Sequence, residues 1–362
     1  MRFDVFYELA VPRFAGRDER TVYHETLAEL SVAEACGIET AWLVEHHFMR
    51  EYSHASAPDL FLAAAAQRTQ RLRLGHAIVP LPYHHPLHVA ERLATLDVLS
   101  NGRVEFGFGR GFSPKEYANF AVPMAESRTR VEEALAILRL SFDRRPFSFA
   151  GQHFQVDNVE VLPHCVQRPH PPLWMATVSP ESFELAARLG VGVLVGPFKP
   201  WFMVKEDIAR YRAAWRGHQR SGTGQVGMTL GLLCLADGKR ARDHAKTNLA
   251  WFYKELLAQT APVLKQLHAG YEYYRRLGTI APLLSAAINL GVLETAGMVV
   301  AGDPAHCGER LGRYAEAGVD RLLLAIGAGG SPSTVVQECL HTLHAEVLPH
   351  FTRAHAHTAD RR

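Results

Sequence analysis

Several side chains suited to acid–base chemistry or to anion binding stand where apolar runs of the chain end. His46 follows the run Thr40–Val44, Arg110 follows the run Val104–Phe108, and a third run leads into Ser179-Pro180-Glu181-Ser182. A histidine changes charge near neutral pH, and an arginine beside a helix start with free N–H groups and hydroxyls can bind phosphate. Together these residues indicate a site in which a phosphate-bearing ligand lies beside an acid–base histidine.

The same residues also have ordinary structural uses. Ser179 can cap a helix whose first residue is Pro180, and Arg110 can be the partner of a structural ion pair. His46 and His47 are neighbours in an extended segment, so they point to opposite faces and at most one of them faces a ligand without a bend. The functional interpretation therefore depends on these residues meeting at one rim of the fold.

Alternating glycines lead up to Arg110. Gly107, Gly109 and Gly111 carry no side chains, which lets a flat ligand approach the backbone closely. This run is not GxGxxG, and neither GxxxxGK[ST] nor GxSxG occurs in the sequence. Rossmann, P-loop and α/β-hydrolase chemistry are therefore not indicated.

A metal site is the other possibility to weigh, because the chain has 20 histidines. His84 and His88 have the four-residue spacing that pairs ligands on one helix face. Pro86 argues against this pair, since His85 precedes proline and is biased away from helix. We expect the helix to begin near Pro86 with His84 outside it, and we expect no catalytic metal.

The scaffold for these residues is predicted from an alternation of short apolar runs with stretches of helical periodicity. The expected strands are Phe3–Tyr7, Thr40–Val44, Leu72–Val79, Val104–Phe108, Leu173–Thr177, Gly192–Gly196, Met228–Ala236 and Arg321–Gly327. Alternation of this kind implies parallel strands joined by helices. Eight repeats is the number at which such a sheet closes into a (β/α)8 TIM barrel, with the active site at the carboxyl ends of the strands. An open doubly wound α/β sheet is the structural alternative.

Two long intervals predict insertions after the fourth and seventh strands. The first, from Gly109 to Pro172, contains a helical stretch and a hairpin over Phe147–Val156; the second, from Asp237 to Asp320, is rich in tyrosine and glycine around His268–Tyr274. Long loops in compact barrels are commonly lids or binding segments, and we expect a lid over about Lys265–Ala296. No low-complexity linker divides the chain, so residues 1–351 are predicted to form one domain and residues 352–362 a polar tail.

Composition narrows the class of protein. Among 362 residues, Lys plus Arg (39) nearly balance Asp plus Glu (37), which gives no excess positive charge to attract nucleic acid or an anionic membrane. The 5 cysteines are scattered and odd in number, so they predict neither a disulfide framework nor a zinc ribbon. A signal peptide and a membrane span are not indicated, and the expected location is the cytoplasm.

At these positions the sequence resembles the bacterial luciferase-like flavin monooxygenases. The segments that carry the resemblance are Cys36–Phe48, Ser100–Gly111, Ala186–Gly190, Gly302–Pro304 and Val347–Pro349. The pattern Glu-His-His-Phe after a strand that contains Trp42, followed later by Gly-Arg-Gly, is fairly specific in this order and spacing. The resemblance extends from Phe3 to Phe351.

The resemblance implies a (β/α)8 barrel that binds reduced FMN, which reacts with dioxygen to give a flavin hydroperoxide that oxygenates a small organic substrate. His46 matches the histidine beside the flavin, a candidate general base or proton donor, and Glu116 matches an acidic residue near the flavin. A separate flavin reductase is then expected to supply the reduced FMN. The resemblance also implies a homodimer that pairs through the helix Pro58–Gln70.

The resemblance further identifies residues that bind the cofactor. Arg110, Ser179 and Ser182 match phosphate-binding positions, Ala77 and Ile78 match a pair joined by a non-prolyl cis peptide under the flavin ring, and Gly109 and Val178 complete the expected set. Luciferases that oxidise long-chain aldehydes carry a cysteine where this chain has Gly109. This departure weakens the case for aldehyde oxidation with light emission.

Two other functions are compatible with the same barrel. One is hydride transfer from a deazaflavin coenzyme without oxygen, and the other is a non-catalytic flavin-binding subunit. His46 argues against the second, because a silent subunit has no need of an acid–base group at the flavin.

Overall fold

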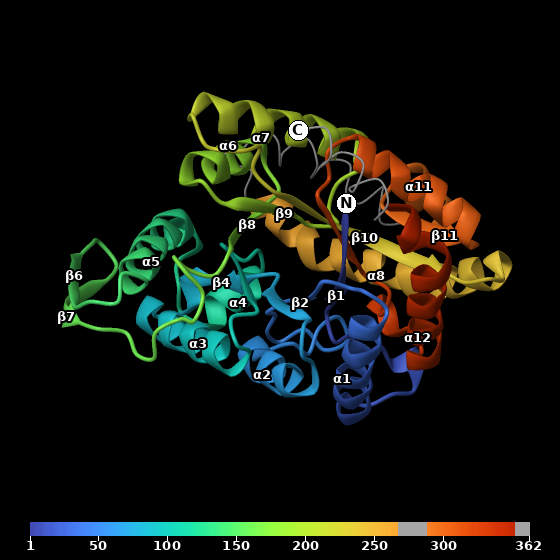
Figure 1. Cartoon of the computed structure of the whole chain (residues 1–362), viewed down its shortest axis with the longest axis horizontal. Helices are drawn as coiled ribbons and strands as arrows, with labels where there is room; N and C mark the ends of the chain where they lie inside the picture. Colours follow the sequence, from blue (N-terminus) through green and yellow to red (C-terminus); the bar gives the residue numbers. More distant parts are fainter. Residues whose placement is uncertain (267–287, 352–362) are drawn as a thin grey trace.

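The computed structural model describes residues 1–266 and 288–351. At its centre is a closed barrel of eight parallel strands, which confirms the predicted fold (Figure 1). In the order in which they pair, the strands are β1 (Arg2–Tyr7), β2 (Thr40–Leu43), β3 (Arg73–His76), β5 (Val104–Gly109), β8 (Leu173–Thr177), β9 (Gly192–Val195), β10 (Val226–Cys234) and β12 (Arg321–Leu324). Pairing of β12 with β1 closes the ring.

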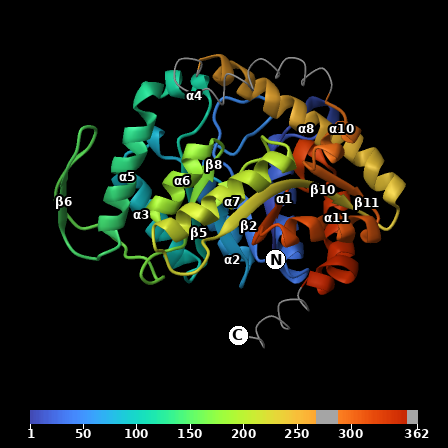
Figure 2. The ribbon, with the colours of Figure 1, turned by 90° about the horizontal axis from the view of Figure 1, so that it is seen from above.

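Helices surround the strands on the outside of the barrel, as the view from above shows (Figure 2). They are α1 (Glu19–Ala35), α2 (Pro58–Arg68), α3 (Pro86–Leu99), α5 (Ser127–Ser141), α6 (Pro180–Leu189), α7 (Trp201–Gly217), α8 (Gly238–Gln266), α11 (Pro304–Glu316) and α12 (Ser333–Thr342). Proline occupies the first position of α2, α3, α6 and α11, where its missing N–H costs no hydrogen bond. As predicted, α3 begins at Pro86 and leaves His84 outside the helix.

Two tryptophans meet inside the barrel. The rings of Trp42 on β2 and Trp174 on β8 lie edge to face with centroids 5.7 Å apart. Their neighbours on the adjacent strands are Gly75 and Gly192, and a Cβ atom at either glycine would overlap the indole beside it. The glycines therefore provide the volume that the two indoles fill.

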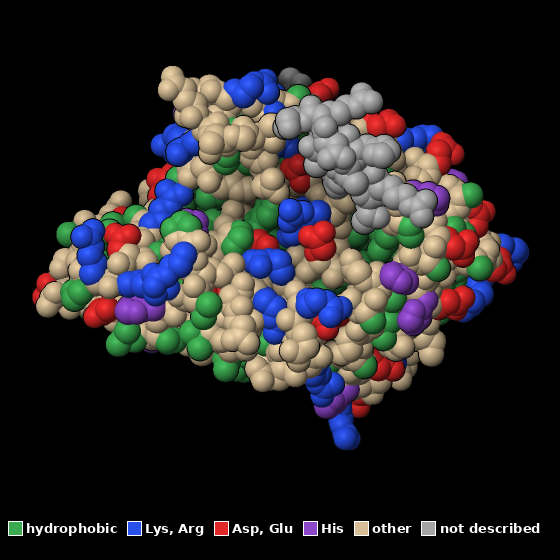
Figure 3. All heavy atoms as spheres, in the orientation of Figure 1, with side chains coloured by type: hydrophobic (Ala, Val, Ile, Leu, Met, Phe, Trp, Pro, Cys, Tyr) green, Lys and Arg blue, Asp and Glu red, His purple; other side chains and the backbone are tan. Residues whose placement is uncertain are grey.

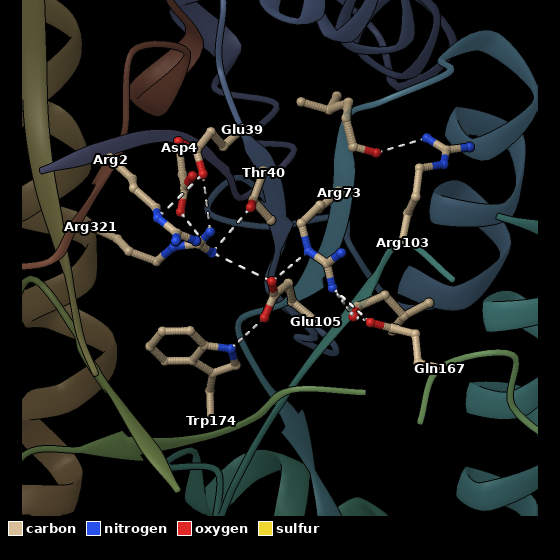
Figure 4. Close-up of polar contacts among 12 residues, drawn as sticks. Arg2, Asp4, Glu39, Thr40, Arg73, Arg103, Glu105, Gln167, Trp174 and Arg321 are labelled. Atoms are coloured by element: carbon tan, nitrogen blue, oxygen red, sulfur yellow. Dashed lines mark hydrogen bonds and ion pairs between the residues drawn. The ribbon is translucent and has the colours of Figure 1, made fainter. Parts of the chain in front are cut away.

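The floor of the barrel, at the amino ends of the strands, holds a buried network of charges (Figure 4). Arg321 on β12 is 1% exposed, and its guanidinium lies 3.5 Å from Asp4 and 3.7 Å from Glu105. The two indoles join this network, since Trp42 Nε1 donates to Asp4 (2.9 Å) and Trp174 Nε1 donates to Glu105 (2.7 Å). Five strands, β1, β2, β5, β8 and β12, are thereby tied together across the barrel interior.

The insertion after the fourth predicted strand contains more structure than expected. It includes the short helix α4 (Pro114–Asn119), then α5, and then the hairpin of β6 (Phe147–Ala150) and β7 (Gln155–Val159). The hairpin was predicted, and it extends from the body of the molecule beyond α5 (Figures 1 and 2). The α4 helix was not predicted, because six residues are too few to show a helical period.

The second insertion joins β10 to β12. Its described parts are α8, the short helix α10 (Leu290–Thr295), the strand β11 (Val299–Gly302) and α11. β11 was not predicted; it lies outside the ring and pairs with the far half of β10, from Gly231 to Cys234. The expected lid falls largely on residues 267–287, which lie outside the described part of the chain, as does the expected tail of residues 352–362.

One predicted strand is divided. The expected run Leu72–Val79 forms β3 and then a separate two-residue strand, β4 (Val79–Pro80). Between them the Ala77–Ile78 peptide is cis, as the family resemblance implies. The interruption places both residues at the carboxyl end of β3, on the rim where the site is expected.

The surface carries charges of both signs, and the described residues contain neither a helix that could span a membrane nor a group of side chains that could hold a metal ion. On the face shown in Figure 3, Lys and Arg side chains are interspersed with Asp and Glu. No helix in residues 1–266 or 288–351 is long and apolar enough to cross a membrane. Within these ranges no three His, Cys, Asp or Glu side chains are grouped so that they could hold a metal ion, and the 5 cysteines have free thiols.

Candidate active site

His46 lies at the carboxyl end of β2 between two buried carboxylates. Its backbone N–H donates to Ala55 O (3.0 Å), which fixes the chain as it leaves the strand. Its Nδ1 faces Glu116 Oε1 at 3.4 Å, and its Nε2 faces Glu8 Oε2 at 3.8 Å. Glu116 is 1% exposed and Glu8 is 5% exposed, so the imidazole is enclosed by acids on both ring nitrogens.

Glu116 is held in place by three donors. Besides His46, the backbone N–H of His47 donates to Oε1 (2.8 Å) and the hydroxyl of Tyr83 donates to Oε2 (3.0 Å). Glu116 reaches this position from α4, whose N-cap Ser113 accepts a hydrogen bond from the Glu116 N–H. The helix that sequence analysis missed is therefore the element that positions the predicted acid.

His47 points to a different set of partners, in agreement with the prediction that the two histidines diverge. Its Nε2 lies 3.0 Å from Glu45 Oε1, and its ring packs edge to face on Phe120. His84 contacts the same Glu45 oxygen at 2.5 Å. Although burial opposes the charged carboxylate, the hydrogen bonds from His47 and His84 lower the pKa of Glu45.

The carboxylates set the protonation of His46. Burial disfavours the imidazolium, but the hydrogen bond to Glu116 and the charges of Glu8 and Glu116 outweigh it, so the pKa of His46 is raised above its ordinary value. Burial raises the pKa of Glu8, and the charge of His46 and the hydrogen bond from Tyr52 oppose that rise. A proton is thus readily held between an imidazole and an acid at the barrel mouth.

Arg110 and the start of α6 follow two strands that pair directly, β5 and β8. Arg110 Nε donates to Ser127 Oγ (2.9 Å), and within the described residues its two terminal nitrogens have no hydrogen bond or ion pair. Ser182 Oγ accepts from Val178 N–H (3.1 Å) and donates to Ser179 O (2.5 Å). Ser182 thus shapes the turn before α6, while the Ser179 side chain makes no capping bond.

A cradle without side chains lies beside these groups. A Cβ atom at Gly109 would stand 3.1 Å from Ile78 Cδ1 and 3.2 Å from Ala176 Cβ. The ends of β3, β5 and β8 therefore pack closely around Gly109, with small and aliphatic groups on both sides. The missing side chain at Gly109 leaves the backbone open to close approach by a flat ligand, and within the described residues nothing competes for the terminal nitrogens of Arg110.

Sequence analysis did not select several residues that the structure brings to the site. They are Glu8, Glu45, Tyr52, Tyr83 and His84. A usable signal existed for Glu8, because it directly follows the first strand and so must lie on the same rim as His46. Tyr52 and His84 lie in loops and Tyr83 ends a three-residue 3-10 helix, and the apolar pattern predicts the path of neither kind of segment.

Comparison with known proteins agrees with this geometry. Residues 1–321 match the family described as luciferase-like monooxygenase. Limonene 1,2-monooxygenase of Rhodococcus erythropolis is 33% identical over 56% of this chain and 56% of its own length. The oxygenase component of a flavin-dependent trigonelline monooxygenase from Acinetobacter baylyi is 30% identical over 54% of each chain. The chain thus spans about half the length of the curated relatives it matches.

Solved structures share the fold along nearly the whole chain. A monooxygenase from Streptomyces bottropensis superposes with a TM-score of 0.79 at 26% identity, over 97% of this chain and 100% of that one. An oxygenating constituent of 3,6-diketocamphane monooxygenase from Pseudomonas putida, solved with FMN, has a TM-score of 0.77 at 18% identity over 96% and 98% of the two chains. A coenzyme F420-dependent reductase from Methanopyrus kandleri has a TM-score of 0.70 at 19% identity over 97% and 99%. The last two comparisons concern the fold alone, whereas the family match over residues 1–321 shows that this chain belongs to the luciferase-like monooxygenases.

Proposed function

We propose that this protein is the oxygenase component of a two-component flavin-dependent monooxygenase, which receives reduced FMN from a separate reductase and oxygenates a small organic substrate. The observation that carries the proposal is a buried acid–imidazole–acid group on the same barrel rim as Gly109 and as Arg110, whose terminal nitrogens have no hydrogen bond or ion pair within the described residues. Bound reduced FMN would supply the electrons that activate dioxygen. The protein's own residues bind, orient and exchange protons.

Arg110 and the Ser179–Ser182 turn would hold the phosphate of FMN. The terminal nitrogens of Arg110 can form charge-assisted hydrogen bonds with phosphate oxygens, and Ser179 opens a helix whose amino end favours an anion. Ala77, Ile78, Gly109 and Val178 would line the ring. They come from the ends of β3, β5 and β8, which are neighbours in the barrel.

His46 would give a proton to, or take one from, the reacting groups at the mouth of the barrel. Its Nδ1 is oriented by Glu116, an arrangement that is common where an imidazole acts as acid or base. Its Nε2 has no hydrogen bond within residues 1–266 or 288–351, so this nitrogen is available for exchange. These features support catalysis over a silent flavin-binding subunit.

The relatives support the type of reaction and the need for a reductase. The trigonelline relative is named as an oxygenase component, and the limonene relative as a monooxygenase of a cyclic hydrocarbon. Both names describe proteins of which this chain matches about half. The substrate of this protein is accordingly proposed only as a small organic molecule.

Titration with reduced FMN and with a reduced deazaflavin coenzyme, each without oxygen, tests the proposal. We expect FMN to bind in the micromolar range or tighter and the deazaflavin to bind more weakly. On admission of oxygen to the FMN complex, consumption of dioxygen should depend on the organic substrate supplied. Tighter binding of the deazaflavin, followed by hydride transfer without oxygen, would contradict the proposal and favour the alternative.

A further inference from the structure

We propose that Glu8 acts through His46 as its proton partner, and that Glu8 Oε2 receives the proton of His46 Nε2 and returns it. The inference deepens the proposed function, because it rests on His46 as the acid–base group of the site. It concerns a residue that directly follows the first strand of the barrel, β1, and that comes within reach of His46 only through the closed fold.

Glu8 is fixed by the loop that follows β2. Tyr52 OH donates to Glu8 Oε1 (2.9 Å), and Ser53 Oγ donates to the backbone oxygen of Glu8 (2.7 Å). The ring of Tyr52 is stacked on Phe252 of α8, with centroids 5.7 Å apart and planes 12° from parallel. One oxygen of the Glu8 carboxylate is therefore satisfied and rigidly placed.

The other oxygen of Glu8 is buried and has no hydrogen-bond partner among the residues that the structure describes. An unpaired buried carboxylate oxygen is costly, and its nearest cationic neighbour is His46 Nε2 at 3.8 Å. This separation is longer than a hydrogen bond, so the proposed transfer requires the imidazole and the carboxylate to come closer. Among the described residues neither atom has another hydrogen-bond partner, so the ring nitrogen faces the carboxylate oxygen as a donor faces an acceptor.

The two carboxylates around His46 can therefore have different tasks. Glu116 accepts from His46 Nδ1, His47 N–H and Tyr83 OH, so its oxygens are occupied and it orients the ring. Glu8 has one oxygen left over. When the proton passes from Nε2 to Glu8 Oε2, the imidazolium becomes neutral imidazole and the carboxylate becomes a neutral acid, and the reverse step restores both.

The charged and titratable groups that face this pair come from three elements. Glu8 and Tyr52 adjoin Nε2, Glu116 on α4 adjoins Nδ1, and Glu45 adds a more distant negative charge. Burial raises the pKa of Glu8, and the charge of His46 opposes that rise, so the protonation of each group depends on that of the other. The pair should consequently titrate as a unit.

The test measures the pKa of His46 by NMR titration of protein that carries isotope-labelled histidine. The His46 signal is assigned by its loss in His46→Gln. Removal of the facing charge in Glu8→Gln should lower the pKa of His46 by about one unit or more, and Glu8→Asp should restore part of the shift. Glu29→Gln is the matched control, since Glu29 is a buried carboxylate on α1 that contacts Tyr7 and Ser333; it should leave the His46 titration unchanged.

Tyr52→Phe provides a second variant that keeps the carboxylate. Loss of the hydrogen bond to Oε1 should shift the His46 titration in the same direction as Glu8→Gln, by a smaller amount. An unchanged His46 pKa in a folded Glu8→Gln protein overturns the inference. Should Glu8→Gln fail to fold, an unchanged titration in both Glu8→Asp and Tyr52→Phe overturns it equally.

The pH dependence of turnover separates this inference from the proposed function. The limb of the pH–rate profile that reports His46 should move to lower pH in Glu8→Gln and partly return in Glu8→Asp. If Glu8→Gln lowers the pKa of His46 but the wild-type protein never oxygenates a substrate with FMN, the proposed function is refuted. The interaction between Glu8 and His46 is supported in that case. Normal oxygenation with an unmoved limb would refute the role of Glu8 alone.

Discussion

The adjacent histidines His46 and His47 allow a direct test of which side chain exchanges protons. His46→Ala should lower turnover per bound flavin by about 10²-fold or more, the usual contribution of general acid–base catalysis, with little change in flavin affinity. His47→Ala is the matched control, because the His47 side chain contacts Glu45 and Phe120 and does not lie between Glu8 and Glu116. This variant should mainly lower the melting temperature. Rescue by imidazole of His47→Ala, but not of His46→Ala, would reverse the assignment.

Arg110 is expected to dominate recognition of the FMN phosphate. Charge-assisted hydrogen bonds contribute about 1.5–3 kcal/mol each, so Arg110→Ala should weaken binding of reduced FMN about tenfold or more. Arg130→Ala is a suitable control from the same insertion, because Arg130 is already paired with Glu126 at 2.8 Å. Equal dissociation constants for wild type and Arg110→Ala, measured by anaerobic titration, would show that the phosphate binds elsewhere.

At the scale of single residues, the apolar pattern identifies side chains that follow strands, whereas Glu116 was expected only from the family resemblance. His46, Arg110 and Ser179 were found because an apolar run ends just before each of them. Glu8 also directly follows a strand, but it belongs to no motif. Its place in the site is apparent only because the closed barrel brings it to His46. Tyr52 and Tyr83 act through loop geometry, which depends on tertiary contacts that no local pattern encodes.

The strands β2 and β3 provide a test of packing at the scale of elements. Gly75 on β3 abuts the indole of Trp42, so a methyl group in Gly75→Ala would overlap the ring and force the barrel interior to shift. Overpacking of this kind costs about 1–3 kcal/mol. Gly312→Ala on α11 is the control, because no atom lies within 4 Å of the added Cβ and alanine favours a helix by about 0.5–1 kcal/mol.

Urea unfolding of the two glycine variants should therefore show changes of opposite sign. Gly75→Ala is expected to move the midpoint to lower urea, and Gly312→Ala to higher urea. Equal stability of Gly75→Ala and wild type would mean that the tryptophan ring can move aside without cost. The close packing inferred for the two indoles would then be wrong.

Elements with long periodic patterns were predicted well, and short ones were not. The eight barrel strands and the helix α2 agree with the expected runs to within a few residues, and α3 begins at Pro86 as expected. The strand β11 and the helices α4 and α10 have four to six residues each. Segments this short show no clear periodic pattern, because their formation depends on the neighbours they pack against. Among these three, α4 matters most for function because it carries Glu116.

At the scale of the whole molecule, the charges of the barrel floor make stability depend on pH. Burial, opposed by Arg321 and Trp42, raises the pKa of Asp4 from 3.8 to about 6. Between about pH 4 and pH 6 the unfolded chain has lost this proton while the folded chain keeps it. Stability therefore falls as pH rises through this window, by roughly 3 kcal/mol from this group.

Asp4→Asn removes this titration and keeps an oxygen to accept from Trp42 Nε1. Relative to wild type, the variant should gain stability between pH 4 and pH 7, as measured by the free energy of unfolding in urea at both values. Glu29, whose pKa burial raises to about 7, titrates in both proteins and cancels in the comparison. A relative loss of stability over this range would mean that attraction to Arg321 outweighs the burial of Asp4.

Two copies of this chain are expected to associate through the helix α2. Ala65 and Ala66 on α2 are buried against the barrel, but Leu60 on the same helix is 75% exposed, and Leu99 at the end of the adjacent α3 is 46% exposed. The two helices pack together, and Gln67 on α2 donates to the backbone oxygen of Leu99. Leu60 at the start of α2 is an exposed apolar side chain of the kind that a protein partner can cover, and a second copy of this chain is the expected partner, as the family resemblance implies.

Sedimentation at micromolar concentration should thus give about twice the chain mass of 40.2 kDa. Leu60→Glu places a charge in the paired surface and should yield the single chain, with flavin affinity retained because the helix lies outside the barrel. Leu162→Glu is the matched control, since Leu162 is also well exposed, at 60%, but lies in the segment that follows the β6–β7 hairpin. A wild-type protein that sediments as one chain, or a Leu162→Glu variant that dissociates as readily as Leu60→Glu, would place the interface elsewhere or exclude it.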